Sequence, residues 1–365
     1  MRGKVSSIGG RFSRLTPHAL RLTCLPILAT LLFSLSGCAK EPIHQQQSFV
    51  FGTMVEVTIY GEEEARAREL SGQVLREFDR LHQTYHAWKP GPLERLNAAF
   101  AEGPAKVGID PEMAGVIANA ARFSEMSGGL FNPAIGNLIK LWGFQSDEFK
   151  PVRPDPQEIA NLVKTNPRMS DIVIVGGEIY SKNPAVRLDL GGYAKGYALD
   201  VAAAYLRAQH VKGALINIGG NIIAIGTRGG SPWRVGIQHP RKPGPIATLD
   251  LADGEAIGTS GDYQRYFLLD GTRYSHIIDP RTGYPSQGVQ AVTVLVPPGP
   301  LAGTLSDVAS KPAFIAGVEG WREAAKKMGI GQVILIDERG EIYLTEAMKK
   351  RLQFVEKGLT LHETQ

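Results

Sequence analysis

The stretch from Tyr274 to Gly283, Tyr-Ser-His-Ile-Ile-Asp-Pro-Arg-Thr-Gly, holds the side chains best suited to chemistry. His276 and Asp279 lie where an apolar strand runs into a Pro/Gly turn. A rigid strand end can hold reactive groups at the rim of a pocket. Histidine titrates near neutral pH and can take a proton from a hydroxyl. We predict His276 as a catalytic base, or as the group that orients a hydroxyl. Asp279 either orients that region or, as we favour, caps the turn before Pro280.

A glycine-rich turn forms the second informative stretch, Val186-Arg-Leu-Asp-Leu-Gly-Gly-Tyr-Ala-Lys-Gly-Tyr197. The pattern predicts a strand that ends near Asp189 and a helix that begins near Ala194. Glycines let the backbone approach a ligand closely, and a helix start offers unpaired N–H groups to an anion. Lys195 adds a positive charge. The turn suits a pyrophosphate, although its spacing is neither P-loop nor GxGxxG and a plain strand-turn-helix junction is the alternative.

Five further motifs occur in an order typical of one family. They are Phe51-Gly-Thr53, His86-Ala-Trp-Lys-Pro-Gly-Pro-Leu-Glu-Arg-Leu-Asn97, Ser127-Gly-Gly-Leu-Phe-Asn-Pro-Ala-Ile-Gly136 with Leu141-Trp-Gly-Phe144, Ile216-Asn-Ile-Gly-Gly-Asn221 and Gly258-Thr-Ser-Gly-Asp-Tyr263. With the two stretches above, they resemble the ApbE-type flavin transferases, from about residue 49 to about residue 346. These enzymes move FMN from FAD onto a threonine or serine of another protein, so the resemblance implies that reaction, with AMP released.

The resemblance also implies which residues contact FAD. In that family the aspartate and lysine of the glycine-rich turn do so, here Asp189 and Lys195. The other expected contacts are Phe51, Trp88 (preferred to Tyr85), Leu130, Phe131, Asn132 and Ile278. Asn132 stands where aspartate is more usual. Trp142 and Phe144 are expected in the core, and Asn217 and Asp262 are either structural groups or contacts.

The metal site that the family implies contains a departure. A backbone carbonyl at Gly192 and the Asp of an Asp-x-x-x-Thr motif usually hold magnesium, but this chain reads Asp307-Val-Ala-Ser-Lys311. Asp307 can bind Mg²⁺, a hard cation that prefers oxygen ligands. Lys311 cannot while it is protonated. Either Mg²⁺ is retained by Asp307, the Gly192 carbonyl, ligand phosphates and water, which we favour, or Lys311 stands in for it. Lys311 could also extend into solvent without a role.

Apolar periodicity predicts an α+β fold, which the resemblance identifies as an ApbE-like, T-fold-related, two-lobed domain with a mainly antiparallel sheet and packed helices. Helices are expected at 62–82, 111–126 (capped by Asp110), 194–209, 306–317 and 319–328. Strands are expected at 49–60, 171–175, 186–190, 214–218, 221–225, 233–237, 263–269, 273–278 and 290–296, with a hairpin at Asp270-Gly271. The proline-rich segment 151–156 is the best candidate for an internal boundary.

The first 38 residues look like a targeting segment. A basic start and an apolar run precede Leu35-Ser36-Gly37-Cys38, which resembles a bacterial lipobox; an ordinary cleaved signal is the alternative. We therefore expect a signal at 1–38 with Cys38 lipidated, a tether at 39–48, the catalytic domain at 49–346 and a tail at 347–365. Ala39 favours the outer membrane in a Gram-negative host, and the body would face the periplasm.

Charge and cysteine content exclude several classes of protein. The chain has 40 Lys and Arg and 36 Asp and Glu, but five of the basic residues and none of the acidic ones lie in residues 1–38, which leaves 35 − 36 = −1. No nucleic-acid partner is implied. The two cysteines fall in the signal and at the lipidation site, so no disulfide, thiolate nucleophile or thiolate zinc site is expected.

The expected partners are FAD, an acceptor flavoprotein subunit of a membrane redox complex, and the membrane itself through the lipid. Three other functions compete with flavin transfer. One is an FAD pyrophosphatase in which water replaces the protein hydroxyl, and another is a lipoprotein that binds FAD without catalysis. The third is an exported α+β domain whose motifs match by chance.

Overall fold

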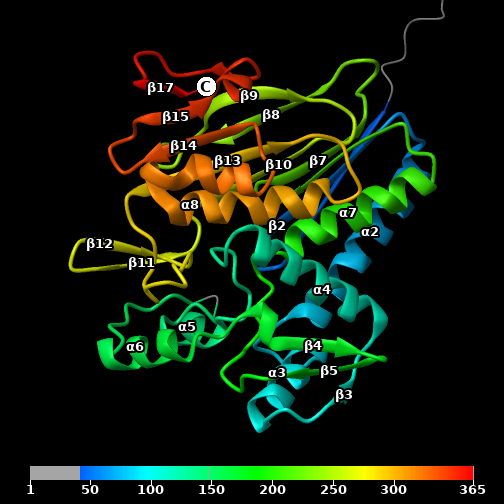
Figure 1. The fold of residues 1–365 in the computed structure, drawn as a ribbon. Helices are drawn as coiled ribbons and strands as arrows, with labels where there is room; N and C mark the ends of the chain where they lie inside the picture. The colour runs from blue at the N-terminus through cyan, green and yellow to red at the C-terminus, as the bar shows by residue number, and fades with distance from the viewer. Residues whose placement is uncertain (1–41, 147, 365) are drawn as a thin grey trace, which may run out of the picture. The chain divides into compact units, whose positions relative to one another are not determined.

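A nine-stranded sheet is the largest element of the computed structural model, which describes residues 42–146 and 148–364 (Figure 1). All neighbouring strands are antiparallel except the last pair. The expected α+β fold with a mainly antiparallel sheet is confirmed. In spatial order the strands are β1 (Ile43–Val50), β2 (Thr53–Tyr60), β6 (Gly213–Ile218), β7 (Asn221–Gly226), β10 (Ala256–Gly261), β13 (Val289–Val296), β14 (Val333–Asp337), β15 (Ile342–Thr345) and β17 (Leu361–Thr364).

Both faces of this sheet are covered. Helices α2 (Glu64–Tyr85), α7 (Ala194–Ala208) and α8 (Ala302–Lys327) pack on one face (Figure 1), and a small sheet of β8 (Trp233–Gln238), β9 (Pro245–Leu251) and β16 (Gln353–Phe354) covers the other. Strand β13 shows the consequence. Val292 and Val294 face the helices, whereas Ala291 and Leu295 face the small sheet. All eight residues of β13 are therefore buried, as a strand between two layers requires.

The remaining elements form two groups. Helices α3 (Pro92–Glu102) and α4 (Pro111–Met126) lie with η1 (Met169–Asp171) and a sheet of β3 (Val107–Gly108), β5 (Glu178–Ser181) and β4 (Ile172–Val175). Helices α5 (Gly136–Leu141) and α6 (Pro156–Thr165) share a separate apolar cluster with the hairpin β11 (Tyr266–Leu269)–β12 (Thr272–Ser275). Trp142 and Phe144 are buried in that cluster, which confirms them as core residues.

Local sequence signals fix several element ends. Asp110 caps α4, because its carboxylate accepts the backbone N–H groups of Glu112 and Met113 at 2.9 and 3.2 Å. Asp270 and Gly271 both have positive φ and join β11 to β12, as the hairpin motif predicted. Asp155 caps α6 at Gln157, so the proline-rich segment 151–156 leads into a helix. From Pro42 onward the chain is a single compact unit, and the expected internal boundary is wrong.

The termini of the described chain differ from expectation. Residues 43–50 form strand β1 rather than part of a tether, and β1 pairs with β2 over its whole length. Its polar side chains point alternately at α2, where Ser71 Oγ lies 3.1 Å from His44 Nε2 and 2.7 Å from Gln46 Oε1. The expected tail contains α9 (Glu346–Lys349), β16 and β17, and β17 pairs in parallel with β15. Strand β1 is held by hydrogen bonds, whereas the C-terminal segment also packs apolar side chains, among them Met348, Phe354 and Leu361, on the sheet.

One expected strand is absent from the structure. Residues 186–190 form no strand; Arg187 and Asp189 instead donate their N–H groups to the carbonyls of Ala134 and Pro133. The two helices expected at 306–317 and 319–328 are confirmed, because α8 is broken by a kink at Gly317, whose backbone is not helical. Strands β9, β10, β14 and β15 were not predicted. The signal segment and Cys38 lie outside the described residues, among which no helix has the length and apolarity to span a membrane.

Candidate functional site

A cavity of about 950 Å³ opens between the ends of the large sheet and the α5 region. That volume is near the upper end for small-molecule pockets, about 300–1,000 Å³. Its lining comes from the β1–β2 turn, the end of α2, the 130–135 loop, the glycine-rich turn, the end of β10, the segment after β12, and α8. Nearly every site residue predicted from the sequence lines it, namely Phe51, Trp88, Leu130, Phe131, Asn132, Asp189, Gly192, Lys195, His276, Ile278 and Lys311. Asp307 is buried behind this surface.

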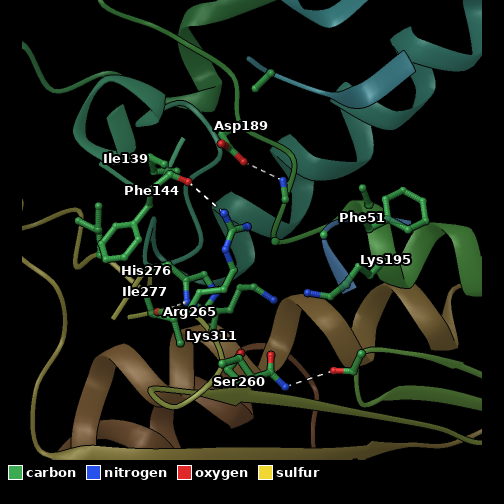
Figure 2. Close-up of a pocket in the computed structure, with 18 of the residues that line it drawn as sticks. Phe51, Ile139, Phe144, Asp189, Lys195, Ser260, Arg265, His276, Ile277 and Lys311 are labelled. Carbon is green, nitrogen blue, oxygen red and sulfur yellow. Dashed lines mark hydrogen bonds between the residues drawn. The ribbon is translucent and has the colours of Figure 1, made fainter. Parts of the chain in front are cut away.

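One side of the cavity is charged. We call it the ionic wall: Lys195, His276 and Lys311, with Asp307 behind them. Figure 2 shows the side chains of Lys195 and Lys311 extending toward one another into the cavity. Lys195 lies in the first turn of α7, and Lys311 belongs to α8, so two packed helices supply the facing ammonium groups.

Close packing of α7 on α8 brings Asp307 to the start of α7. A Cβ atom on Gly196 would lie 2.4 Å from the carbonyl oxygen of Gly303, so only glycine permits this approach. The Gly196 N–H donates to Asp307 Oδ2 at 2.9 Å. The sequence predicted a helix start that is open to an anionic ligand, but Asp307 already occupies part of it.

Lys311 fills the space beside Asp307. Its Nζ donates to Asp307 Oδ1 and to the Asp307 backbone oxygen, both at 2.7 Å. Its stem packs on Gly192, where an added Cβ would lie 2.7 Å from Lys311 Cε. Burial by itself would raise the pKa of Asp307, but the charges of Lys311 and Lys195 and the Gly196 hydrogen bond outweigh it and hold this pKa below its usual value. Asp307 is therefore ionised at neutral pH.

The residues present do not fit a divalent metal at the predicted ligands. Magnesium requires oxygen ligands in octahedral geometry. Asp307 Oδ1 and Oδ2 are engaged by Lys311 and Gly196, and the Lys311 side chain lies between Asp307 and Gly192. Within residues 42–146 and 148–364, no cluster of at least three His, Cys, Asp or Glu side chains could hold a metal ion. The lysine occupies the position that the sequence analysis assigned to the cation.

His276 faces the cavity with one ring nitrogen fixed. Its Nδ1 lies 3.2 Å from the backbone oxygen of Arg265, and because a carbonyl only accepts, Nδ1 carries the proton. Nε2 is then the atom with the free lone pair. Burial, followed by the charges of Arg265, Lys195 and Lys311, lowers the pKa of His276 to about 3. The ring is neutral at pH 7 and can accept a proton at Nε2.

The cavity also has an apolar lining. We call it the aromatic wall: Phe51, Trp88, Leu130 and Phe131. Trp88 is half-buried, and its Nε1–H donates to Asp189 Oδ2 at 2.9 Å. The Arg187 guanidinium lies 4.5 Å from the centre of the Trp88 ring. Asp189 Oδ1 accepts the N–H of Gly191 at 2.8 Å, so this carboxylate links the aromatic wall to the glycine-rich turn.

Phe51 has a backbone conformation that is rare for its type. Its φ of 56° and that of 69° at Gly52 form the two-residue turn between β1 and β2. A bulky residue at positive φ is strained, and such strain is typical of functional sites. The ring packs on Phe78 and His82 with centroids 6.1 and 5.5 Å away.

Asn132 and Ile278 line the cavity but also have structural contacts. Asn132 Nδ2 donates to the backbone oxygen of Pro167, and its Oδ1 accepts the N–H of Ala134. An aspartate could not make the first of these bonds, which accounts for the amide at this position. Ile278 packs with the α5 cluster. Their roles toward FAD stay predictions.

The sequence analysis left three polar residues open or gave them structural roles. Asp279 accepts the N–H of Arg281 and pairs with its guanidinium, which confirms it as a turn cap. Asn217 accepts the N–H of Gly220 at 2.9 Å, a turn contact. Asp262 pairs with Arg241 at 2.6 Å. The structure gives all three residues intramolecular partners.

The sequence analysis missed several lining residues. Arg265 lies in the connection between β10 and β11, and its guanidinium donates to the backbone oxygens of Phe144 and Ser146. Thr259 and Ser260 belong to the Gly258–Tyr263 motif, which pointed to the pocket without naming them. No spacing signal marks Arg265, because it contacts backbone carbonyls far away in the chain.

Comparison with known sequences identifies relatives of this chain. Residues 51–334 match the profile of the ApbE family. An FAD:protein FMN transferase of Rhodobacter capsulatus is 41% identical over 320 residues, covering 88% of this chain and 60% of that protein. One from Klebsiella pneumoniae is 30% identical over 80% of this chain and 84% of its own. Another, from Treponema pallidum, is 31% identical, with coverages of 80% and 85%.

Solved structures agree with the sequence matches. The crystal structure of an ApbE protein from Thermotoga maritima superimposes with a TM-score of 0.77 and 29% identity, covering 85% of this chain and 99% of the other. The apo form of the flavinyl transferase ApbE from Pseudomonas stutzeri gives a TM-score of 0.74 with 26% identity, covering 86% and 98%. The similarity spans nearly all described elements.

Proposed function

This chain belongs to the ApbE family, and we propose that it carries out FMN transfer in the cavity between its ionic and aromatic walls. The family makes it an FAD:protein FMN transferase. The observation that carries the proposed location is the pair of facing ammonium groups, Lys195 and Lys311, in a cavity that half-buried rings also line. A dinucleotide with a charged diphosphate and a flat flavin matches these two surfaces.

The diphosphate of FAD would lie against the ionic wall. Lys195 and Lys311 would neutralise the charge that builds on the transferring phosphoryl group. The isoalloxazine would stack on the aromatic wall, with Trp88 held by Asp189. Most of the rate enhancement in phosphoryl transfer comes from positioning and electrostatics. Both walls are suited to that work.

Transfer would proceed by attack of an acceptor hydroxyl. The oxygen of a threonine or serine forms a bond to the FMN-side phosphorus, the bond between the two phosphates breaks, and AMP leaves. His276 Nε2 accepts the proton of the hydroxyl, because its Nδ1–H is fixed on Arg265. The residues at the predicted ligands do not fit Mg²⁺, and no step here depends on a metal.

An acceptor assay tests this proposal. Purified protein is mixed with FAD and a threonine-bearing acceptor domain, and the products are followed by mass spectrometry and chromatography. Addition of FMN to the acceptor with release of AMP is expected. Free FMN would instead indicate pyrophosphatase activity with water as acceptor. Unchanged FAD would indicate binding alone.

The cellular setting rests on the sequence of residues 1–41. We propose a lipid on Cys38, a location on the periplasmic side of a bacterial membrane, and an acceptor that is a flavoprotein subunit of a membrane redox complex. Fractionation of cells tests the anchor. The native chain is expected with membranes, and Cys38→Ser is expected in the soluble fraction. Equal distribution of both chains would contradict the lipid.

A further inference from the structure

We propose that Lys311 is a resident cation, a positive charge built into the chain that binds the diphosphate where a divalent metal would otherwise be needed. The inference rests on the proposed function, because it concerns the same cavity. It implies that FMN transfer by this chain needs no metal held by the protein.

The position of the ammonium group is the first argument. Lys311 Nζ lies 2.7 Å from two oxygens of Asp307, its carboxylate Oδ1 and its backbone oxygen. The Lys311 side chain is 16% exposed and lines the cavity. A lysine that merely extends into solvent would not be held by two acceptors on one residue. These two hydrogen bonds therefore hold the ammonium group at a fixed position beside Asp307.

The state of Asp307 is the second argument. Its Oδ2 accepts the N–H of Gly196, and its Oδ1 accepts Lys311. A metal at Asp307 would have to displace the lysine, whose stem is packed on Gly192. It would also bring a divalent charge next to an ammonium group in a poorly hydrated site, where like charges repel strongly.

The hydrogen-bonding capacity of Lys311 is the third argument. An ammonium group has three N–H donors, and Asp307 uses two of them. Across the described residues, the structure shows no protein acceptor for the third. Because Lys311 lines the cavity, that donor is available to a ligand oxygen. A phosphate oxygen would accept a strong, charge-assisted hydrogen bond from this ammonium group.

The balance of charge at the ionic wall is the fourth argument. Lys195 and Lys311 face one another, and the buried carboxylate of Asp307 lies beside Lys311. Arg265 adds a further positive charge near His276. The wall is therefore positive before any metal binds. An anion placed between the two ammonium groups relieves their repulsion, which a cation would increase.

A metal-free assay tests the inference directly. FMN transfer is measured in EDTA and again with excess Mg²⁺. The native chain is expected to transfer FMN at rates that agree within roughly twofold in the two conditions, since EDTA cannot remove the ammonium group of Lys311. A loss of about 100-fold in EDTA, recovered with Mg²⁺, would overturn the inference while it upheld the proposed transfer.

The Lys311→Thr variant should depend on a metal, unlike the native chain. It removes the ammonium group and opens an oxygen ligand beside Asp307. We expect it to lose about 100-fold in EDTA and to regain most of that activity with Mg²⁺. Lys326→Thr, an exposed lysine of the same helix, is the matched control and should respond to neither condition. A Lys311→Thr chain that transfers FMN normally in EDTA would contradict the role of the charge.

Binding of Mn²⁺ to the protein without FAD gives a readout that does not depend on activity. Electron paramagnetic resonance should detect no stoichiometric Mn²⁺ on the native chain and one bound ion on Lys311→Thr. Stoichiometric Mn²⁺ on the native chain, lost in Asp307→Asn, would overturn the resident cation. Because this experiment needs no turnover, it separates failure of this inference from failure of the proposed function.

Discussion

The ionic wall and the aromatic wall are held in different ways. On the ionic wall, Asp307 and Lys311 are almost enclosed. Asp307 accepts a hydrogen bond from Gly196 of α7, and Lys311 donates two hydrogen bonds to Asp307 within α8. On the aromatic wall, Trp88 and Phe51 are half-buried residues of loops and turns, and one hydrogen bond orients the indole. Groups that act on a developing charge need exact placement, whereas a flat ring tolerates small shifts. We therefore expect the ionic wall to set kcat and the aromatic wall to set KM.

Replacing His276 should give the largest change. His276→Ala removes the group that accepts the proton, and general base catalysis contributes about 100- to 10,000-fold. The expected result is a kcat lower by about 1,000-fold, with KM for FAD little changed, measured by the acceptor assay. His362→Ala, whose ring contacts Glu341 outside the cavity, is the control. Normal transfer by folded His276→Ala would remove His276 from the mechanism.

Breaking the buried ion pair should lower stability. In Asp307→Asn the ammonium group of Lys311 loses its buried carboxylate. The asparagine amide has only one accepting oxygen, so its N–H₂ group, a donor, must face either the Gly196 N–H or the Lys311 ammonium group. Removing one partner of a buried pair is destabilising by about 3 kcal/mol or more. Urea unfolding measures this change. Asp250→Asn, at the exposed pair with Arg234, should shift the midpoint little. Equal effects of the two substitutions would mean that the ionic wall is not rigid.

A smaller change is expected on the aromatic wall. Trp88→Phe keeps a ring and removes the hydrogen bond to Asp189. A bond to a charged group contributes about 1.5 kcal/mol or more, so KM for FAD should rise about tenfold while kcat stays nearly constant. Trp233→Phe is the control, because its Nε1 donates to Ile225 away from the cavity. A fall in kcat with an unchanged KM would reverse the roles of the two walls.

The pH profile should show almost no effect near neutrality. The pKa of His276 is lowered to about 3, so in the free enzyme the ring gains a proton only in strong acid. The base is unprotonated throughout the neutral range. Since kcat/KM reports the free enzyme, it should vary by roughly twofold or less as the pH falls from about 7.5 to 5.5. An acidic limb centred near pH 6.5 would show that His276 has an unperturbed pKa or another role.

Sequence reasoning located the cavity better than it located the strands. Glycine-bearing motifs mark places where backbones approach closely, and the segments around Phe51, Gly192 and Lys195 converge on one cavity. Strand β1 was missed because its side chains are polar and make hydrogen bonds to α2. Residues 186–190 looked like a strand, yet their partners are loop carbonyls of Pro133 and Ala134. An alternation of apolar residues indicates that a segment is buried, but it does not show which other segment will pair with it.

The relation between Lys311 and Asp307 shows a different limit. The spacing of four residues put both on one face of a helix, and the sequence left open whether lysine replaced a metal or pointed to solvent. The outcome depends on Gly192 and Gly196, which let the lysine stem and α8 approach. Those contacts are made across the fold. Likewise, Arg265 contacts the carbonyls of Phe144 and Ser146, which no local pattern announces.

A crystal structure of the chain with FAD, grown in EDTA, tests the central claim most directly. The account predicts the diphosphate in the cavity between the ammonium groups of Lys195 and Lys311, with phosphate oxygens within hydrogen-bonding distance of both Nζ atoms and the flavin against Trp88. A diphosphate outside the cavity would contradict that claim. So would a diphosphate inside the cavity that has no oxygen within hydrogen-bonding distance of Lys311 Nζ.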